Sequence, residues 1–347
     1  MFFYMHRGLV KCNGIARYIR KFGCIGTIMV YMDFELQPGK YVLAVSGGVD
    51  SVALLHALSQ KQRDESQVSR TETSQPSGPW SPYSFVVAHF DHGIRPDSVK
   101  DRQLVQTLSE RYRIPFVYSE GKLGPRASEA VARKARYDFL HYARRESGAV
   151  AIITAHHQDD VLETIILNLM RGTGRRGLSS LKSTATVRRP LLHIAKKELL
   201  RYAKREGLQW REDSTNMDQR YARNYIRKNV LPRFVNTDRE ALLEISSKSQ
   251  HLDIEITQLT NDYLHAQPGT KILNRHSFIM LPHAVAREIM AAWLRANTDV
   301  ELSRQLLERL VTAAKIGRSG SKTDATGDYW LCVHKELLEL RAKSRWG

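Results

Sequence analysis

The hydrophobic pattern of the chain alternates between short apolar runs and segments with helical spacing. Buried strands are predicted at the apolar, β-favouring runs 40–45, 84–88, 115–119 and 149–154. Helices are predicted at 52–58, 97–112, 128–146, 162–170, 196–206 and 223–234. Strands that alternate with helices in this way predict an α/β fold, in which helices cover both faces of a parallel sheet.

The remainder of the chain has a different organisation. A surface loop is predicted over 60–83, which is polar and has no hydrophobic period. A long helix is predicted at 240–265, followed by a smaller α+β unit with helices at 284–296 and 303–314 and a hairpin within 322–340. We therefore expect four parts: an extension at 1–31 without a catalytic role, a catalytic domain at 32–237, a linking helix at 238–268 and a C-terminal domain at 269–347.

The turn after the first strand carries the most informative chemistry, because residues 44–55 read AVSGGVDSVALL. Gly47 and Gly48 lack side chains that would block a phosphate from backbone N–H groups at a helix N-terminus. Ser46 and Ser51 add hydroxyl donors. Asp50 repels phosphate unless a divalent cation lies between them, so this residue predicts Mg²⁺. No Gly-Lys-Ser/Thr follows the glycines, which excludes an ordinary P-loop.

A second polar cluster, THHQDDVLET, follows the strand at 149–154. A helix that begins near Gln158 would present Asp160 and Glu163 on one side, with His156 at the mouth of the same cleft. Neighbouring carboxylates after a buried strand are costly unless a cation neutralises them, and a metal together with a substrate ammonium would do so. Capping of the helix N-terminus would explain the presence of Asp159, but it leaves the other two carboxylates, Asp160 and Glu163, unexplained.

Two further segments could contribute to the site. In the helix at 128–146, Arg133 and Arg136 lie one turn apart and could clamp a phosphate or a developing negative charge. The packed stripe expected for that helix is Val131, Ala135, Phe139 and Tyr142. In the loop AHFDHGIR at 88–95, two histidines and an aspartate are too few for a firm zinc site, so we expect this loop to frame the adenosine and a target base.

Charge and composition limit the partners and the compartment. The net charge of +17 favours a polyanion such as nucleic acid, and residues 171–233 hold 17 lysines and arginines against 5 acidic residues. Three scattered cysteines predict a reducing, cytoplasmic location. No apolar run reaches membrane-spanning length. The basic, acid-free residues 1–31 also suggest a targeting segment, although Met32 is a natural start for the first domain.

The turn at 46–51 resembles the pyrophosphate loop of the N-type ATP pyrophosphatases, and the chain is similar to the tRNA(Ile)-lysidine synthase family through RPLL at 189–192, DSTN at 213–216 and Arg223-Asn224. The resemblance covers about residues 40–235 and implies an adenine-nucleotide alpha hydrolase-like domain. It implies ligation of L-lysine to C2 of the wobble cytidine of tRNA(Ile) with a CAU anticodon, through an adenylated intermediate, with release of AMP and pyrophosphate.

The resemblance also implies roles for individual residues. The loop from Ser46 to Ser51, Val49 included, would hold pyrophosphate, and Asp50 and Asp160 would share Mg²⁺. Asp160 and Glu163 would receive the lysine ammonium groups. Arg136 would stabilise charge at the α-phosphate, and His156 would position the nucleotide or accept a proton, since an unperturbed histidine titrates near neutrality. The expected tRNA contacts are Arg171, Arg175, Arg176, Arg223, Arg227 and Lys228, besides the C-terminal domain.

Individual residues of the sequence argue against three alternative functions. A tRNA thiolase would need cysteines near the site, and a glutamine-dependent synthetase would need a nucleophile such as an N-terminal cysteine, where this chain has Phe2. A non-catalytic RNA-binding protein would not need Asp50, Asp160 and Glu163 together. The resemblance is compatible with a homodimer.

Overall fold

The computed structural model describes residues 36–72, 81–93, 98–121, 123–124, 128–179, 181–211, 222–267, 269–299 and 302–343. The expected extension at 1–31 and the DSTN motif lie outside these residues. The chain divides into two units at Leu243 and Glu244, and the short segment Gly174–Ser179 groups with the second unit. The domain boundaries expected from the sequence remain a proposal.

The first unit is built on a five-stranded parallel sheet with the order β3-β2-β1-β4-β5. Its strands are β1 Gly39–Ala44, β2 Tyr83–Asp91, β3 Phe116–Glu120, β4 Ala151–Ile153 and β5 Val187–Arg188. Its longer helices are α3 Val49–Glu72, α4 Ser98–Tyr112, α5 Glu129–Glu146, α6 Gln158–Met170 and α8 Lys196–Arg205. The expected α/β class is confirmed.

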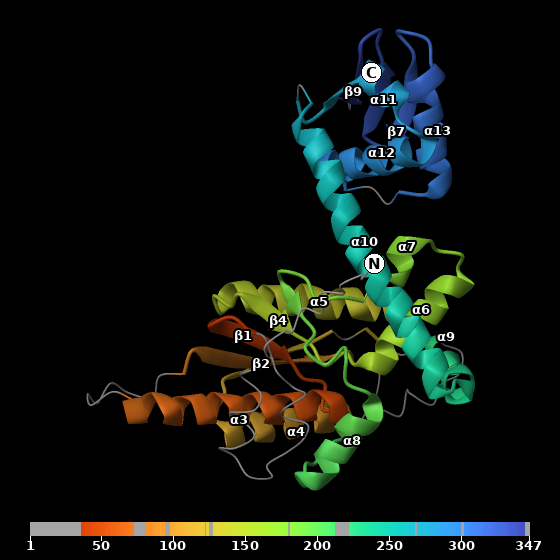
Figure 1. Cartoon of the computed structure of the whole chain (residues 1–347). Coiled ribbons are helices and arrows are strands. Elements are labelled where there is room, and N and C mark those ends of the chain that lie inside the picture. The colour runs from red at the N-terminus through yellow and green to blue at the C-terminus, as the bar shows by residue number, and fades with distance from the viewer. Residues whose placement is uncertain are drawn as a thin grey trace, which may run out of the picture. The chain divides into compact units, whose positions relative to one another are not determined.

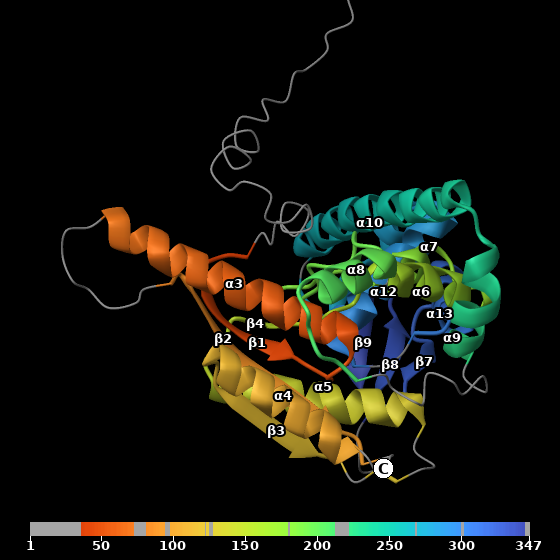
Figure 2. The same cartoon turned by 90° about the horizontal axis from the view of Figure 1, so that it is seen from below.

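Both faces of this sheet are covered, as the alternation of buried residues along its strands requires. Leu43 and Val87 pack in one cluster with α3, α4 and α8, whereas Val42 and Val86 pack in another with α5. Figure 1 shows α5 on one side of the sheet and α3, α4 and α8 on the other, and Figure 2 shows the same arrangement from below.

The strand order brings two loops together. Strands β1 and β4 are neighbours in the sheet although β2 and β3 lie between them in sequence. The connection after β1 therefore runs to one side of this strand, and the connection after β4 runs to the opposite side. In open α/β sheets, ligands bind in the crevice at the carboxyl ends of two such neighbouring strands. The turn after β1 is the glycine turn at 46–51, and the turn after β4 begins the cluster at His156.

The second unit has its own core around an antiparallel sheet in the order β6-β9-β8-β7, which comprises β6 Ile272–Asn274, β7 Lys322–Thr326, β8 Tyr329–Val333 and β9 Leu337–Ala342. The predicted hairpin is thus a three-stranded meander. Helices α11 Arg275–Met280, α12 His283–Asn297 and α13 Arg304–Ile316 pack with this sheet, and the short α7 Arg175–Leu178 also belongs to this unit. A single helix, α10 Asn236–His265, confirms the predicted long helix.

Three local predictions are wrong. The loop predicted from Gln60 is helical as far as Glu72; its polar residues have high helix propensity, and Gln62 donates to the carbonyl of Tyr83 at 3.2 Å. The basic helix predicted at 223–234 is irregular, with α9 Ala222–Tyr225, a π-helix at Ile226–Val230 and a 3₁₀ turn at Leu231–Arg233. The third error is the packed stripe of α5.

In α5 the buried face is displaced by about one residue from the predicted stripe. Val131 and Tyr142 are exposed, and the buried residues are Ala132, Leu140 and Ala143. Arg136 lies in helical register with Ala132 and Leu140, four residues from each. The prediction failed because a long arginine side chain occupies a position on the sheet-facing side of the helix.

Candidate functional site: a pyrophosphate loop facing a carboxylate pair

The glycine turn connects the end of β1 to the start of α3 at Val49. Its two serines cross-brace the turn, since the backbone N–H of Ser46 donates to Ser51 Oγ at 3.2 Å and the two hydroxyl oxygens lie 3.2 Å apart. Gly47 has a φ of 92°, a conformation that L side chains rarely adopt. The turn therefore presents small residues and a helix N-terminus at the edge of the sheet, as anion binding requires.

Asp50, in the first turn of α3, is held by a cation from the protein itself. Lys196 Nζ, at the start of α8, lies 2.6 Å from each carboxylate oxygen of Asp50. Both side chains are partly exposed. The residue expected to bind Mg²⁺ thus already has a full positive charge beside it.

His157 joins the glycine turn to the carboxylates of α6. Its Nε2 lies 3.7 Å from Asp50 Oδ2 and 3.6 Å from Asp160 Oδ2, and its backbone N–H donates to Asp160 Oδ2 at 2.9 Å. The His157 side chain is buried, whereas the side chains of Asp50 and Asp160 are partly exposed. The structure therefore brings Asp50 and Asp160 into one cluster.

Glu163 lies deeper on the same helix and has no exposed surface. Arg227 binds it in bidentate fashion, with Nε 2.6 Å from Oε1 and Nη2 2.9 Å from Oε2, and the same guanidinium lies 3.4 Å from Asp160 Oδ1. Burial raises the pKa of the Glu163 carboxyl, and the hydrogen bonds and charge of Arg227 oppose this shift. Arg227 thus neutralises Glu163 in this structure, and its expected contact with tRNA phosphate stays a prediction.

Arg136 and His156 lie among several positive charges. Burial lowers the pKa of Arg136, and Arg136 Nε is buried without a hydrogen-bond partner in the described part of the chain. Burial, followed by the charges of Arg189 and Arg136, lowers the pKa of His156 well below its usual range. The His156 ring lies 2.8 Å from Thr154 Oγ1 through Nδ1, and the two roles expected for it, positioning the nucleotide or accepting a proton, stay a prediction.

The histidine segment predicted as a loop at 88–95 is in fact strand as far as Asp91, because β2 extends to that residue and pairs with β3. His89 is buried, its Nδ1 lies 2.9 Å from the carbonyl oxygen of Val45, and burial lowers its pKa. The Asp91 carboxylate accepts from the backbone N–H of Gly93 at 2.8 Å and from Ser98 Oγ at 3.0 Å. Within the described ranges, no three or more His, Cys, Asp and Glu side chains gather as a metal site.

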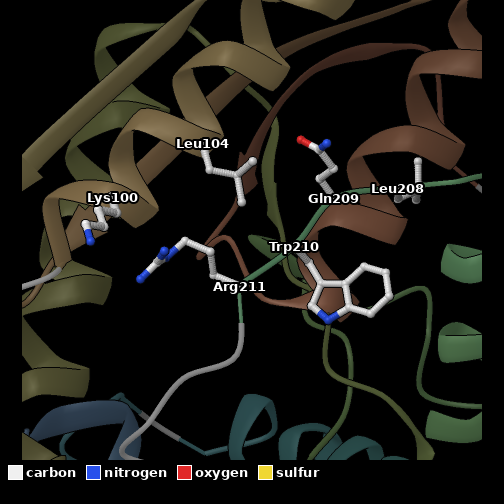
Figure 3. A pocket seen from close by; sticks show the side chains of 6 residues that line it. All are labelled: Lys100, Leu104, Leu208, Gln209, Trp210 and Arg211. Atoms are coloured by element: carbon white, nitrogen blue, oxygen red, sulfur yellow. The ribbon is translucent and has the colours of Figure 1, made fainter.

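A cavity of about 560 Å³ lies beside the glycine turn (Figure 3). The backbone N–H of Arg211 donates to the carbonyl of Gly47 at 3.0 Å, and Arg211 Nε lies 2.5 Å from the buried Asp101 carboxylate. These contacts tie the segment after α8 to the glycine turn. The cavity is lined by Lys100, Leu104, Leu208, Gln209, Trp210 and Arg211.

The arginines expected to contact tRNA differ in their surroundings. Arg171 is exposed just after α6, and Lys228 is half-buried. Arg223 is shared between Glu129 Oε1 at 3.3 Å and Thr164 Oγ1 at 3.4 Å. In the second unit, Arg175 pairs with Asp253 and Glu288, and Arg176 also pairs with Glu288 at 3.1 Å.

The sequence motifs did not identify Lys196 and His157 as members of the site, nor the pairing of Arg227 with Glu163. Lys196 follows RPLL by a few residues, and a lysine at a helix N-terminus, which the helix dipole disfavours, is the one local signal that could have drawn attention to it.

The model of the PP-loop domain family matches residues 28–234.

The chain belongs to the PP-loop family.

Among similar proteins, this PP-loop chain is 41% identical over 197 residues to a tRNA(Ile)-lysidine synthase of Thermus thermophilus, with 55% of this chain and 35% of that protein covered. It is 33% identical over 300 residues to the tRNA(Ile)-lysidine synthase of Deinococcus radiodurans, covering 83% and 46% of the two chains. The similarity expected from the motifs is confirmed. The chain spans about a third to a half of the length of these relatives.

A solved structure supports the fold. A U34-tRNA thiolase from Methanococcus maripaludis superposes with a TM-score of 0.50 at 17% identity, covering 69% of this chain and 78% of that one. At this identity the similarity concerns the PP-loop fold. Across the described residues, no helix is both long and apolar enough to cross a membrane.

Proposed function

We propose that this PP-loop protein is a tRNA(Ile)-lysidine synthase, which uses ATP to join L-lysine to C2 of the wobble cytidine of tRNA(Ile) with a CAU anticodon. The observation that carries the proposal is the single cluster formed by the pyrophosphate turn and by Asp160 and Glu163, bridged by His157. A phosphate site beside carboxylates is suited to an enzyme that activates one substrate with ATP and then admits a cationic second substrate.

The first half-reaction would take place at the glycine turn. The backbone at Gly47 and Gly48 and the hydroxyls of Ser46 and Ser51 would hold the pyrophosphate while the C2 carbonyl oxygen of cytidine attacks the α-phosphate. Pyrophosphate would leave, and the base would carry AMP. Arg136, whose buried Nε has no partner in the described residues, would donate to the anionic α-phosphate.

The second half-reaction requires an uncharged lysine ε-amine, which would attack C2 and displace AMP. Asp160 would receive the α-ammonium, together with Glu163 once the guanidinium of Arg227 shifts from it. The neutral ring of His156 would orient the adenylated base. We propose the positioning role for His156, because its Nδ1 is held 2.8 Å from Thr154 Oγ1 and fixes the orientation of the ring.

The residues also fit a magnesium ion, which would neutralise phosphate charge when bound. Asp50 and Asp160 offer the carboxylate oxygens that Mg²⁺ prefers. The Lys196 ammonium, 2.6 Å from both oxygens of Asp50, occupies the place of a cation, so Lys196 would release Asp50 when the ion and ATP bind and would then be free to contact the phosphates.

Incorporation of radiolabelled lysine into a transcript of tRNA(Ile) with anticodon CAU, with and without ATP, tests the proposal. The methionine tRNA with the same anticodon is the control. We expect ATP-dependent labelling of the isoleucine transcript alone, loss of labelling in Asp50→Asn, and a raised KM for lysine in Glu163→Gln. Release of AMP on adding tRNA without any labelling would contradict the proposal and indicate another nucleophile, such as the sulfur used by a thiolase.

A further inference from the structure

A buried polar pair joins α3 to α8 in the core of the first unit. His56 Nδ1 lies 2.7 Å from the Tyr202 hydroxyl oxygen, and the two residues are 9% and 2% exposed. The residues of α3 and α8 around them are mostly apolar and buried. Polar groups at such a position are costly unless they are hydrogen-bonded, so a satisfied pair specifies how two elements meet as well as how tightly they pack.

The hydrogen bonds of His56 fix the orientation of its ring. Gln60 Nε2, one turn further along α3, lies 3.1 Å from His56 Nε2. An amide N–H can only donate, so Nε2 accepts, and the proton of the neutral ring is on Nδ1, which donates it to the Tyr202 oxygen. Burial lowers the pKa of His56, which favours the neutral ring. The Tyr202 hydroxyl is therefore the specific partner of Nδ1.

The pair follows the contact that the same two helices make at the site. Asp50 and His56 are six residues apart on α3, and Lys196 and Tyr202 are six residues apart on α8. The two contacts are therefore about 9 Å apart along the helices and occur in the same order. This arrangement allows the Tyr202 hydrogen bond to fix the register of α8 against α3.

The first residue of α8 has two ties of its own. The Asp159 carboxylate accepts from the backbone N–H of Lys196 at 3.1 Å, and Lys196 Nζ pairs with Asp50. Both ties lie at the helix N-terminus, and the apolar contacts of Leu199 with the core are not directional. The hydrogen bond of Tyr202 is directional and holds α8 at a second point, so it determines the direction in which the helix runs.

We propose that Tyr202 and His56 are positioning residues for Lys196. Their hydrogen bond fixes α8, and α8 presents the Lys196 ammonium to Asp50 before ATP binds and to the phosphates afterwards. The place of an ammonium on a long, flexible side chain depends on where its backbone is held. The second step rests on the proposed function, in which Lys196 leaves Asp50 for the phosphates.

The reactivity of the Lys196 amine measures this positioning on the full chain. The protein is treated briefly with acetic anhydride at neutral pH, and acetylation of Lys196 and of its exposed neighbour Lys197 is followed by mass spectrometry. An ammonium held by a carboxylate reacts slowly, because only the uncharged amine is nucleophilic. Tyr202→Phe should raise the rate at Lys196 about threefold relative to Lys197, because it removes one buried hydrogen bond.

Matched variants separate positioning from a general loss of stability. Tyr112→Phe is the control, because Tyr112 is buried in the same core and its hydroxyl has no hydrogen-bond partner among the residues described. It should leave the ratio of the two rates unchanged. Asp50→Asn sets the upper limit, since it removes the carboxylate itself. His56→Leu should act as Tyr202→Phe does, whereas His56→Asn keeps a polar group near the place of Nδ1 and should stay close to wild type.

Steady-state kinetics test the second step. With lysine incorporation into tRNA as the assay, Tyr202→Phe should raise the KM for ATP about threefold and leave the KM for lysine unchanged, a split that a general loosening of the site would not give. No incorporation by any variant, wild type included, would refute the proposed function, while faster acetylation of Lys196 in Tyr202→Phe would still support the positioning pair. An unchanged rate at Lys196 in Tyr202→Phe, or an equal increase in Tyr112→Phe, would overturn the inference.

Discussion

At the scale of single residues, the salt bridge between Glu163 and Arg227 pairs a buried carboxylate of the site with a single guanidinium. Glu163 is fully buried and Arg227 is partly exposed. We expect Arg227→Met to lower the unfolding free energy by about 2–4 kcal/mol, somewhat less than for a fully buried pair, because it leaves a carboxyl without its cation. Urea denaturation at neutral pH measures the change.

The double variant Glu163→Gln/Arg227→Met distinguishes the contribution of the ion pair from that of the packing around it. With both charges gone, much of the loss should be recovered, so the two substitutions should be strongly non-additive. Purely additive losses would contradict the view that the bidentate contact, and not local packing, is what Arg227 supplies.

Lys196 supports a second prediction at this scale. Removing its ammonium in Lys196→Met leaves the Asp50 carboxylate without its nearest cation. The affinity for divalent cations should then rise about tenfold, because the ion no longer competes with a fixed positive charge. Titration with Mn²⁺ in the absence of ATP and tRNA measures this directly, and Lys197→Met is the control. Weaker Mn²⁺ binding in Lys196→Met would show that the lysine does not compete for Asp50.

At the scale of the elements, the two glycines of the pyrophosphate turn should respond differently to alanine. Gly47 has a φ of 92°, whereas an added Cβ there would meet Asp101 only at an ordinary 3.6 Å. Gly47→Ala should therefore cost about 1–2 kcal/mol of stability through backbone strain. Gly48 does not have a positive φ of this kind, so Gly48→Ala should preserve the melting temperature and weaken ATP binding. Equal melting temperatures for the two variants would contradict this assignment.

The elements themselves were largely predictable because the signals that determine them are local. An apolar run followed by Gly47-Gly48 and a helical segment identified β1, the turn and α3, and Ser128 identified the start of α5, where its side chain accepts from the backbone N–H of Val131. The buried face of α5 was not predictable, since Val131 is as apolar as a core residue and yet is exposed. Hydrophobic spacing alone could not choose between neighbouring registers of that helix.

The contacts within the site were less predictable than the motifs. Asp50, Asp160 and Glu163 could be identified from sequence because each lies in a short motif after a strand. Their cations could not, since Lys196 is 146 residues from Asp50 and Arg227 is 64 residues from Glu163. Which lysine or arginine folds back onto a carboxylate depends on how α8 and the irregular helix at 222–233 pack, and the sequence pattern of the motifs does not contain that information.

At the scale of the whole molecule, buried imidazoles should make the protein sensitive to mild acid. Burial lowers the pKa of His56, His89 and His156 from the usual 6.5. Below that value the unfolded chain takes up protons that the folded chain does not, so the unfolding free energy should fall as pH decreases from about 7.5 to 5.5. Each histidine contributes at most about 1.4 kcal/mol per pH unit.

Denaturation curves at several pH values measure the slope of the unfolding free energy against pH. Two variants identify the residues that cause this slope. His56 Nδ1 lies 2.7 Å from the Tyr202 hydroxyl in the core, so His56→Gln should reduce the slope. His251→Gln, at an exposed histidine, should leave it unchanged. A slope of the same size in both variants would attribute the acid sensitivity to carboxylates instead.

The excess positive charge of the molecule should appear as a steep salt dependence of tRNA binding. Exposed Arg171 should contribute one phosphate contact, so Arg171→Ala should reduce the slope of log affinity against log salt by about 1. Arg175→Ala is the matched comparison, because its charge is already neutralised by Asp253 and Glu288; it should change the slope little. Filter binding between low and moderate salt measures both. A flat response of the wild type would contradict the polyanion interpretation, whereas a large slope change in Arg175→Ala would show that its ion pairs open when tRNA binds.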